Sequence, residues 1–257
     1  MRIEKYDEGV PSWVDLGAPD PQQAADFYGA LFGWDVPPGM EEAGGYRVAM
    51  VGDDPVAGIG PQQSPGPPYW TTYVNVADAD AAAAKVVEHG GQVLVPPMDV
   101  LEAGRMAVFM DPVGAAFSVW QPNQHPGAGL VNEPGTWSWS ELITTDVEAS
   151  KAFYGAVFGW GSETHGDGPG AYTEWKVGGR SVSGMMAKPP MMPAEVPPHW
   201  GVYFSVADTD TAIGRIQELG GALVMGPMDV EPGRMAVVTD PGGAVFNVIT
   251  LNESRLG

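Results

Sequence analysis

The stretch Phe27-Tyr28-Gly29-Ala30-Leu31-Phe32-Gly33-Trp34 returns later in the chain as Phe153-Tyr154-Gly155-Ala156-Val157-Phe158-Gly159-Trp160, with one residue changed. A second stretch, residues 97–119, likewise returns as residues 227–248. Because both repeats keep their order and nearly their spacing, the sequence predicts a duplicated domain. The predicted parts are a first domain at residues 8–122, a linker at residues 123–135 and a second domain at residues 136–252.

The overall composition narrows the class of protein. With 257 residues, each copy is long enough to bury a core of its own. The net charge of −20 argues against a nucleic-acid partner, because phosphate binding needs clustered lysine and arginine. The absence of cysteine excludes disulfides, cysteine–zinc sites and thiol catalysis. No apolar run is long enough to span a membrane and the N-terminus resembles no signal peptide, so we expect a cytoplasmic protein.

Local patterns predict the same order of elements in each copy. Residues 12–16 alternate as a strand does, and Asp20 can cap a helix over Pro21–Phe32 that Gly33 ends. In the second copy, Thr145 is expected to start the matching helix. After a proline-rich loop the order begins again within each copy, so the sequence predicts four βαβββ units.

A βαβββ unit has one helix for four strands, so the helix covers only one face of its sheet. The predicted fold class is therefore α+β, with two tandem domains. Each domain is expected to contain two units that form a half-open, eight-stranded barrel around a central groove, where a ligand would bind. Which units pair with one another stays open at this point.

Two motifs carry a family resemblance. Paired βαβββ units resemble the vicinal oxygen chelate superfamily when Phe-Tyr-x-x-x-Phe-Gly-Trp ends the first helix and Asp-Pro-x-Gly-x-x-Phe, here starting at Asp111 and Asp240, precedes the last strand. That superfamily includes glyoxalase I, extradiol dioxygenases and the bleomycin- and fosfomycin-resistance proteins. The chain is most similar to the tandem glyoxalase-like proteins of actinobacteria.

The resemblance implies a metal site with His, Gln or Glu ligands on the first and last strands of the units. The corresponding positions here hold none of these residues; they are Trp13, Thr71, Ser118, Trp139, Gly201 and Asn247, with Gly60 and Met186 near the ends of the first and third units. The histidines His89, His125, His165 and His199 are expected on a helix end, the linker, a loop and a strand. We therefore expect no metal and no other cofactor. A metal-dependent lyase or dioxygenase of the glyoxalase type remains the alternative.

Strand alternation predicts which side chains face the grooves. The candidate ligand-binding residues are Trp13, Tyr69, Tyr73, Ser118, Trp120, Trp139, Tyr203 and Asn247. Their aromatic rings offer flat surfaces, and their hydroxyl and amide groups offer a few polar contacts. Trp13 and Trp139 could equally well fill the space of the missing metal as parts of the core. By contrast, Trp34 and Trp160 are expected in the core.

Three residues are candidates for acid–base chemistry. Asp15 and Glu141 share the face of the two tryptophans, where burial would raise the pKa of a carboxyl group. Their alternative role is to hold strands together. His199 has the same facing and could exchange a proton near Glu141, although a lone histidine is often structural. Arg105 and Arg234 are expected to pair with nearby aspartates, Asp99 and Asp229.

These features predict a metal-independent protein that binds a small aromatic or apolar molecule. The molecule could be cationic, given the acidity of the chain. Such a protein could act in tailoring or resistance in antibiotic biosynthesis, either as a sequestering binder or as an enzyme of proton transfer. We expect no nucleic-acid or membrane partner, and a monomer with internal pseudo-dimer symmetry or a homodimer.

Overall fold

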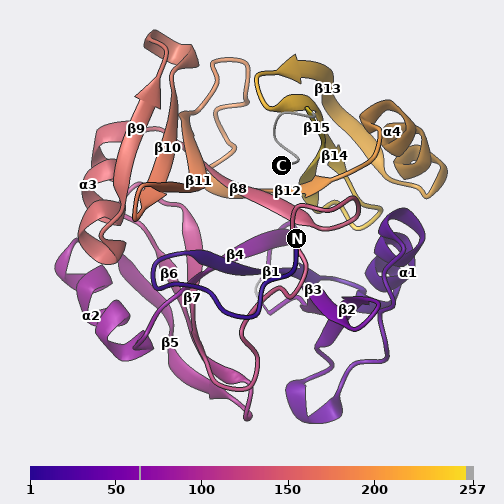
Figure 1. The fold of residues 1–257 in the computed structure, drawn as a ribbon, viewed down its shortest axis with the longest axis horizontal. Helices are drawn as coiled ribbons and strands as arrows, with labels where there is room; N and C mark the ends of the chain where they lie inside the picture. The colour runs from indigo at the N-terminus through magenta and orange to yellow at the C-terminus, as the bar shows by residue number, and fades with distance from the viewer. Residues whose placement is uncertain (64, 253–257) are drawn as a thin grey trace.

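The computed structural model describes residues 1–63 and 65–252. Four α-helices cover a sheet whose hydrogen-bonded strands come from both copies (Figure 1). The helices are α1 (Pro21–Phe32), α2 (Ala79–Glu88), α3 (Val147–Phe158) and α4 (Thr209–Glu218). The strands of the first copy are β1 (Pro11–Ala18), β2 (Arg47–Val51), β3 (Asp54–Pro61), β4 (Tyr69–Asn75), β5 (Gln92–Val100), β6 (Gly104–Met110) and β7 (Ala116–Pro122). Those of the second copy are β8 (Trp137–Thr144), β9 (Gly161–His165), β10 (Tyr172–Val177), β11 (Arg180–Ala187), β12 (His199–Ser205), β13 (Ala222–Val230), β14 (Gly233–Thr239) and β15 (Val245–Leu251).

Each helix begins at an aspartate. The side chain of Asp20 accepts hydrogen bonds from the backbone N–H groups of Gln22 and Gln23, so the predicted start of α1 is confirmed. The prediction of Thr145 as the start of the matching helix is wrong, because Asp146 caps α3 through the N–H of Ala149. An aspartate oxygen satisfies one of the free N–H groups of the first turn, and Asp146 occupies the same place as Asp20.

The first strands of neighbouring units hold each copy together. β1 pairs with β4 in antiparallel register, with Asp15 opposite Thr71, and β8 pairs with β12, with Glu141 opposite Gly201. Unit one therefore closes on unit two, and unit three on unit four. The strand order is β2-β3-β1-β4-β7-β6-β5 in the first copy and β9-β10-β11-β8-β12-β15-β14-β13 in the second.

The two copies differ at one edge. The second copy has the eight expected strands, whereas the first has short bridges, Asp35 with Met50 and Met40 with Tyr46, in the place of β9. His165, expected on a loop, ends strand β9. The segment of the first copy that matches β9 contains Pro37 and Pro38. Because proline has no backbone N–H to donate, this segment forms only isolated bridges and no regular strand.

The repeated helix motif joins the two copies. The hydroxyl group of Tyr28 donates to Asp240 Oδ2 at 3.1 Å, and Trp34 Nε1 donates to the carbonyl oxygen of Gly135 at 2.6 Å. The second copy makes the equivalent contacts with the first. The hydroxyl group of Tyr154 donates to Asp111 Oδ2 at 3.0 Å, and Trp160 Nε1 donates to the carbonyl oxygen of Gly9 at 2.6 Å. Buried hydrogen bonds between distant segments fix their relative position, so the motif is an architectural brace.

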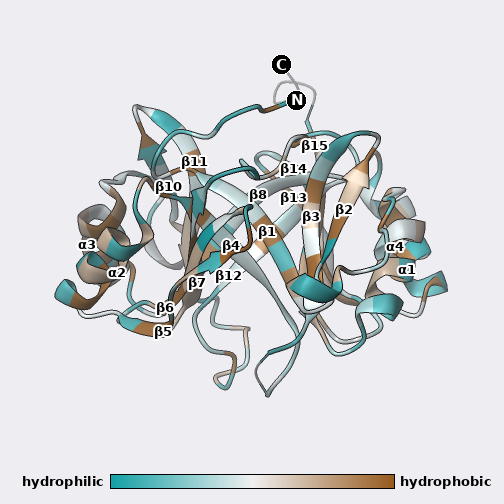
Figure 2. Ribbon diagram, turned by 90° about the horizontal axis from the view of Figure 1, so that it is seen from below, coloured by the Kyte–Doolittle hydropathy of each residue, from teal (hydrophilic) through white to brown (hydrophobic). Residues whose placement is uncertain are grey.

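The helices pair across this junction. α1 contacts α4, and α2 contacts α3. Figure 2 shows these two helix pairs at opposite ends of the molecule, with the strands between them. Trp34 and Trp160 are each 5% exposed, which confirms the prediction that they belong to the core. Within the described residues, no helix is long and apolar enough to cross a membrane.

The arginines that follow glycine are structural. Arg105 Nη1 lies 2.9 Å from Asp99, and Arg234 Nη1 lies 2.9 Å from Asp229, as predicted. Each arginine also reaches an aspartate in the first turn of the neighbouring helix; these aspartates are Asp80 and Asp210. Both arginines therefore tie a strand hairpin to a helix at the surface.

Candidate functional site

The inner face of the first copy carries a connected group of polar and aromatic side chains. Trp13 Nε1 donates to the hydroxyl oxygen of Tyr46 at 2.9 Å, and this hydroxyl donates to Asp15 Oδ2 at 3.1 Å. The hydroxyl of Tyr73 donates to the same carboxylate oxygen at 2.9 Å. We call these four residues the first carboxylate cluster. They come from β1, β4 and the residue before β2, and the pairing of β1 with β3 and β4 and of β3 with β2 brings them together.

The second copy repeats this arrangement, and we call its four residues the second carboxylate cluster. Trp139 Nε1 donates to the hydroxyl of Tyr172 at 2.9 Å, and the hydroxyl of Tyr203 donates to Glu141 Oε1 at 2.9 Å. The hydroxyl of Tyr172 lies near the same carboxyl group and lowers its pKa, as the hydroxyl of Tyr203 does. An indole, two phenols and one carboxyl group are therefore held in the same relative order in both copies.

Two glycines make room for the tyrosines. Gly58 lies opposite Asp15 on β3, and a Cβ atom there would lie 1.8 Å from the hydroxyl oxygen of Tyr46. Gly184 lies opposite Glu141 on β11, and a Cβ atom there would lie 1.9 Å from the hydroxyl oxygen of Tyr172. Real atoms cannot approach so closely, so any other residue at either position would displace the phenol from the carboxyl group.

The carboxyl groups lie in an environment that favours their neutral form. Burial raises the pKa of Asp15 to about 6, against the opposing effect of hydrogen bonds from Tyr73, Tyr46 and Thr71. Burial also raises the pKa of Glu141, which is 7% exposed. Among the residues described, neither carboxyl group forms an ion pair. Each can therefore hold a proton at a pH where an exposed carboxyl group is ionised, which is a property of acid–base groups.

The predicted site residues do not all join these clusters. The structure brings together Trp13, Asp15 and Tyr73 in one copy, and Trp139, Glu141 and Tyr203 in the other. Tyr69 lies apart at the start of β4 and is 45% exposed. His199 starts β12 opposite Ile143, and its Nδ1 lies 2.8 Å from the carbonyl oxygen of Pro197. Within the described residues no hydrogen bond links this imidazole to Glu141.

Three further predicted residues lie on the last strands. Ser118 is fully buried opposite Tyr73, and Asn247 lies opposite Tyr203 with its Nδ2 donating to the carbonyl of Val202 at 3.0 Å. Trp120 Nε1 donates to the carbonyl of His125 at 2.8 Å. These side chains lie beside the clusters.

Tyr46 and Tyr172 are functional candidates that sequence analysis missed. Tyr46 precedes β2, which comes beside Asp15 because β3 pairs in parallel with β1. Tyr172 begins β10, which comes beside Glu141 because β11 pairs in parallel with β8. The usable signal was the recurrence of a tyrosine with a glycine twelve residues later in both copies, Tyr46 with Gly58 and Tyr172 with Gly184.

The residues of the clusters do not fit a metal ion of the family type. Zinc or iron needs about three convergent imidazole or carboxylate groups. Of the residues described, only Glu163, His165 and Glu174 converge in this way, and they lie on the outer β9–β10 hairpin. There Lys176 forms ion pairs with both glutamates, at 3.1 Å and 2.5 Å, and neutralises part of their charge. Each carboxylate cluster offers one carboxyl group, and its neighbours are phenols and an indole.

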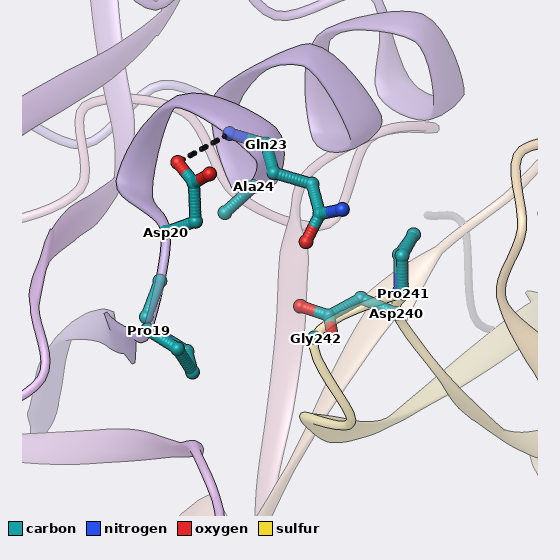
Figure 3. A pocket seen from close by; sticks show the side chains of 8 residues that line it. Pro19, Asp20, Gln23, Ala24, Asp240, Pro241 and Gly242 are labelled. Atoms are coloured by element: carbon teal, nitrogen blue, oxygen red, sulfur yellow. Dashed lines mark hydrogen bonds between the residues drawn. The ribbon is translucent and has the colours of Figure 1, made fainter.

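Two surface hollows lie at the junction of the copies. One hollow of about 10 Å³ separates the start of α1 from the turn at Asp240–Gly242 (Figure 3). It is large enough for about one water molecule. Another, of about 110 Å³, lies between Gly9, Lys85 and Phe158. The inner face of the first copy is largely filled by its own side chains, as the 4% exposure of Trp13 illustrates.

The fold and the duplicated clusters define a tandem protein of paired βαβββ units. The chain belongs to the Glyoxalase/Bleomycin resistance protein/Dioxygenase superfamily, whose family model matches residues 11–119 and 137–248. Two known structures share this fold over nearly the whole chain. The Mn(II)-bound glyoxalase from Novosphingobium aromaticivorans has a TM-score of 0.64 at 16% identity and covers 95% of this chain and 82% of its own. The 2,2',3-trihydroxybiphenyl 1,2-dioxygenase from Sphingomonas wittichii has a TM-score of 0.65 at 13% identity and covers 98% and 95%.

Closer relatives come from actinobacteria. The chain is 42% identical over 254 residues to the protein named "Putative glyoxylase CFP32" of Mycobacterium tuberculosis, covering 95% of this chain and 96% of the relative. It is 38% identical over 270 residues to "Anthracycline biosynthesis protein DnrV" of Streptomyces peucetius, covering 98% and 96%. The protein is thus a glyoxalase-fold protein with homologues in anthracycline biosynthesis.

Proposed function

We propose that this chain binds a small, planar aromatic molecule at a carboxylate cluster without the help of a metal ion. The observation that carries the proposal is the repeated arrangement of an indole, two phenols and a carboxyl group, beside which the described residues place no set of metal-ligating groups. Aromatic side chains supply flat contact surfaces, and a few buried polar groups fix a ligand's orientation. Trp139, Tyr172, Glu141 and Tyr203 supply both.

The names of the relatives support a ligand from secondary metabolism. DnrV, and DauV of a Streptomyces strain, are each named an anthracycline biosynthesis protein and are 38% identical to this chain over nearly its full length. Anthracyclines are fused aromatic ring systems that carry carbonyl and hydroxyl groups. A molecule of this chemistry could stack on Trp139 and exchange hydrogen bonds with Glu141 and the two phenols. The role would be in tailoring of such a molecule or in resistance by sequestration.

A second candidate function is proton transfer on the bound molecule. It is favoured by one observation, the raised pKa of Glu141 beside the hydroxyl groups of Tyr172 and Tyr203. A carboxyl group whose pKa is raised can donate its proton to a carbonyl oxygen, or accept one from a neighbouring carbon once it is ionised. The two phenols would hold the carboxyl group in place and stabilise its ionised form.

The alternative is a metal-dependent enzyme of the glyoxalase type, as the name of the 42% identical relative suggests. It would require ligands other than the residues at the family's ligand positions, which are tryptophan, serine, threonine, glycine and asparagine. The polar groups nearest to those positions are already hydrogen-bonded to one another.

One set of measurements tests these functions. The protein is purified without chelator and analysed for zinc, nickel, iron and manganese. It is then titrated with 1,4-dihydroxyanthraquinone, a planar probe, and with daunorubicin, while tryptophan fluorescence is followed. We expect substoichiometric metal, quenching on binding, and recovery of the probe unchanged unless the protein is a catalyst. Stoichiometric metal whose removal abolishes activity would establish the metal-dependent alternative, and absence of any binding would refute the proposed ligand class.

A further inference from the structure

We propose that the imidazole of His125 is an internal occupant of the first copy, which closes the first carboxylate cluster to ligands and leaves the second as the single ligand site. A corollary is that removal of this ring creates a latent second site for a planar ring. The assignment of the second cluster rests on the proposed function. The occupancy of the first cluster by His125 does not, and it can be tested separately.

The His125 ring lies against two tryptophans of the inner face. Its centroid is 4.5 Å from that of Trp13, with an angle of 86° between the planes, and 5.9 Å from that of Trp120, at 69°. These are edge-to-face contacts, one of the arrangements that aromatic rings prefer. The carbonyl oxygen of His125 also accepts a hydrogen bond of 2.8 Å from Trp120 Nε1. The ring therefore occupies the place on Trp13 that a ligand ring would need.

The segment that follows His125 is anchored across β1. The N–H of Ala128 donates to the carbonyl of Ser12 at 2.8 Å, and the hydroxyl of Tyr6 donates to the carbonyl of Ala128 at 2.8 Å. Gly127 has a φ of +123°, and a Cβ atom there would lie 2.4 Å from the carbonyl oxygen of Ser12. This close backbone approach requires glycine and fixes the linker over the first copy.

The imidazole of His125 is suited to the apolar surroundings of the two indoles. Burial lowers the pKa of His125 to about 4, so the ring is uncharged at neutral pH. Its Nε2 is buried and has no hydrogen-bond partner among the described residues. Packing on the two indoles, together with the backbone bonds, therefore holds the ring.

The second copy lacks this cover in the described part of the chain. Trp139 is only partly buried, whereas Trp13 is 4% exposed. Trp139 packs against the cluster of Tyr203, Met235 and Ile249, and among residues 1–63 and 65–252 no imidazole lies on it as His125 lies on Trp13. The position that corresponds to Trp120 holds Ile249, which offers no indole N–H to anchor a carbonyl group. In the described residues, the connecting segment therefore supplies no side chain that covers Trp139 as His125 covers Trp13.

The occupancy is tested by chemical rescue with imidazole. His125→Ala should lower the melting temperature, and added imidazole, at a pH where it is neutral, should raise the melting temperature of this variant in a saturable way. The natural protein and His125→Phe, which keeps a ring in place, should show no such rise. Should His125→Ala fail to fold, His125→Ser provides the same space with a small polar side chain. A folded variant whose melting temperature is insensitive to imidazole overturns the occupancy.

The single site is tested by calorimetric titration with 1,4-dihydroxyanthraquinone. We expect one bound molecule per natural chain, two for His125→Ala and one for His125→Phe, and for His125→Ala combined with Trp139→Ala one site of unchanged affinity and one weakened site. Two molecules per natural chain would overturn the inference while leaving the proposed function intact. Rescue by imidazole without any binding of the anthraquinone would overturn the proposed function and the assignment of the second site, but keep His125 as the occupant.

Discussion

The hydroxyl group of Tyr203 donates a hydrogen bond of 2.9 Å to Oε1 of Glu141, across the antiparallel pairing of β12 with β8. The phenol is the donor, so the carboxyl oxygen is the acceptor. Tyr203 and Tyr172 both stabilise the ionised form of Glu141, while burial favours its neutral form. The protonation state of this one carboxyl group depends on the balance of the two effects.

If the protein is a catalyst, Glu141→Gln should keep affinity for the ligand within a small factor, while turnover falls by about 10²–10⁴-fold. Glutamine retains the size and the acceptor oxygen of the side chain but cannot carry the proton. The measurement is single-turnover conversion of the cognate molecule beside equilibrium binding. Asp15→Asn is the matched variant in the first copy and should leave turnover unchanged, because that cluster is covered. Equal affinity and no chemical change of the ligand in any variant would mark a sequestering protein.

The pKa of Asp15 predicts how stability depends on pH. Because its folded value, about 6, lies above its ordinary value of 3.8, the folded state binds the proton more tightly than the unfolded state does. The stabilisation from protonated Asp15 is therefore complete below about pH 4 and is lost as the pH rises through about 6.

Asp15→Asn removes this dependence. Relative to the variant, the natural protein should lose up to about 3 kcal/mol of unfolding free energy between these two pH values, at about 1.4 kcal/mol per pKa unit. Urea unfolding at several pH values measures the difference. The exposed Asp53→Asn serves as the control and should run parallel to the natural protein. Parallel curves for Asp15→Asn as well would show that Asp15 keeps an ordinary pKa.

The glycines opposite the carboxyl groups predict a steric effect. Gly58→Ala and Gly184→Ala should each lower the unfolding free energy by about 1–3 kcal/mol, because the new methyl group overlaps a tyrosine hydroxyl. Combining Gly58→Ala with Tyr46→Ala should cost less than the sum of the single changes, because the clash with the phenol is then gone and only the milder contact with Asp15 Cβ, at 2.8 Å, is left. Gly214→Ala on α4, where nothing lies within 4 Å of the added atom, should be neutral or stabilising. Strict additivity in the double variant would contradict the packing described for Tyr46.

The two tryptophans of the clusters should respond differently to truncation. Trp139→Ala should weaken binding of a planar aromatic ligand by about 1–3 kcal/mol, as for an aromatic anchor at a binding site. Trp13→Ala should instead lower stability, since this indole packs on His125 within the core, and it should leave binding by the folded fraction unchanged. Fluorescence titration and thermal unfolding separate the two effects. Weakened binding in both variants would show that both copies take a ligand.

The brace between the copies predicts cooperative unfolding. Tyr28→Phe removes the hydrogen bond to Asp240 and leaves Trp70 Nε1 without its acceptor, so it should cost about 1–3 kcal/mol. Because Tyr28 belongs to one copy and Asp240 to the other, the loss should appear in a single unfolding transition of the whole chain. Fluorescence and circular dichroism recorded on the same denaturant series provide the measurement. Two transitions, of which only one shifts, would mean that the copies unfold independently.

Elements with local causes were predictable from the sequence. The helix at Pro21–Phe32 is set by an aspartate cap, a proline in the first turn and a terminal glycine, all within fourteen residues, and it has the predicted bounds. The pairing of Arg105 with Asp99 follows from the register of one hairpin, β5 with β6. Strand alternation likewise places Trp13 and Asp15 on one face.

The parts of the fold and of the candidate site that the sequence did not predict depend on contacts between distant segments. Tyr46 reaches Asp15 only because β3 pairs with β1 in parallel, and no local pattern indicates that pairing. His125 lies in a segment rich in proline and glycine, which is typical of a linker, and its contact with Trp13 comes from a backbone path across β1. The partners of Tyr28 and Tyr154 lie in the opposite copy, so they appear only when the relative position of the copies is known.

The brace has a consequence for how such a chain can arise. Each copy carries both parts of the contact, a helix tyrosine and a turn aspartate: Tyr28 with Asp111 in one, Tyr154 with Asp240 in the other. A single copy is therefore complementary to itself, and two identical copies could form a closed homodimer with two equivalent braces. Fusion into one chain removes the requirement that both halves stay alike. One half is then free to accept a side chain from the connecting segment while the other keeps its inner face for a guest molecule.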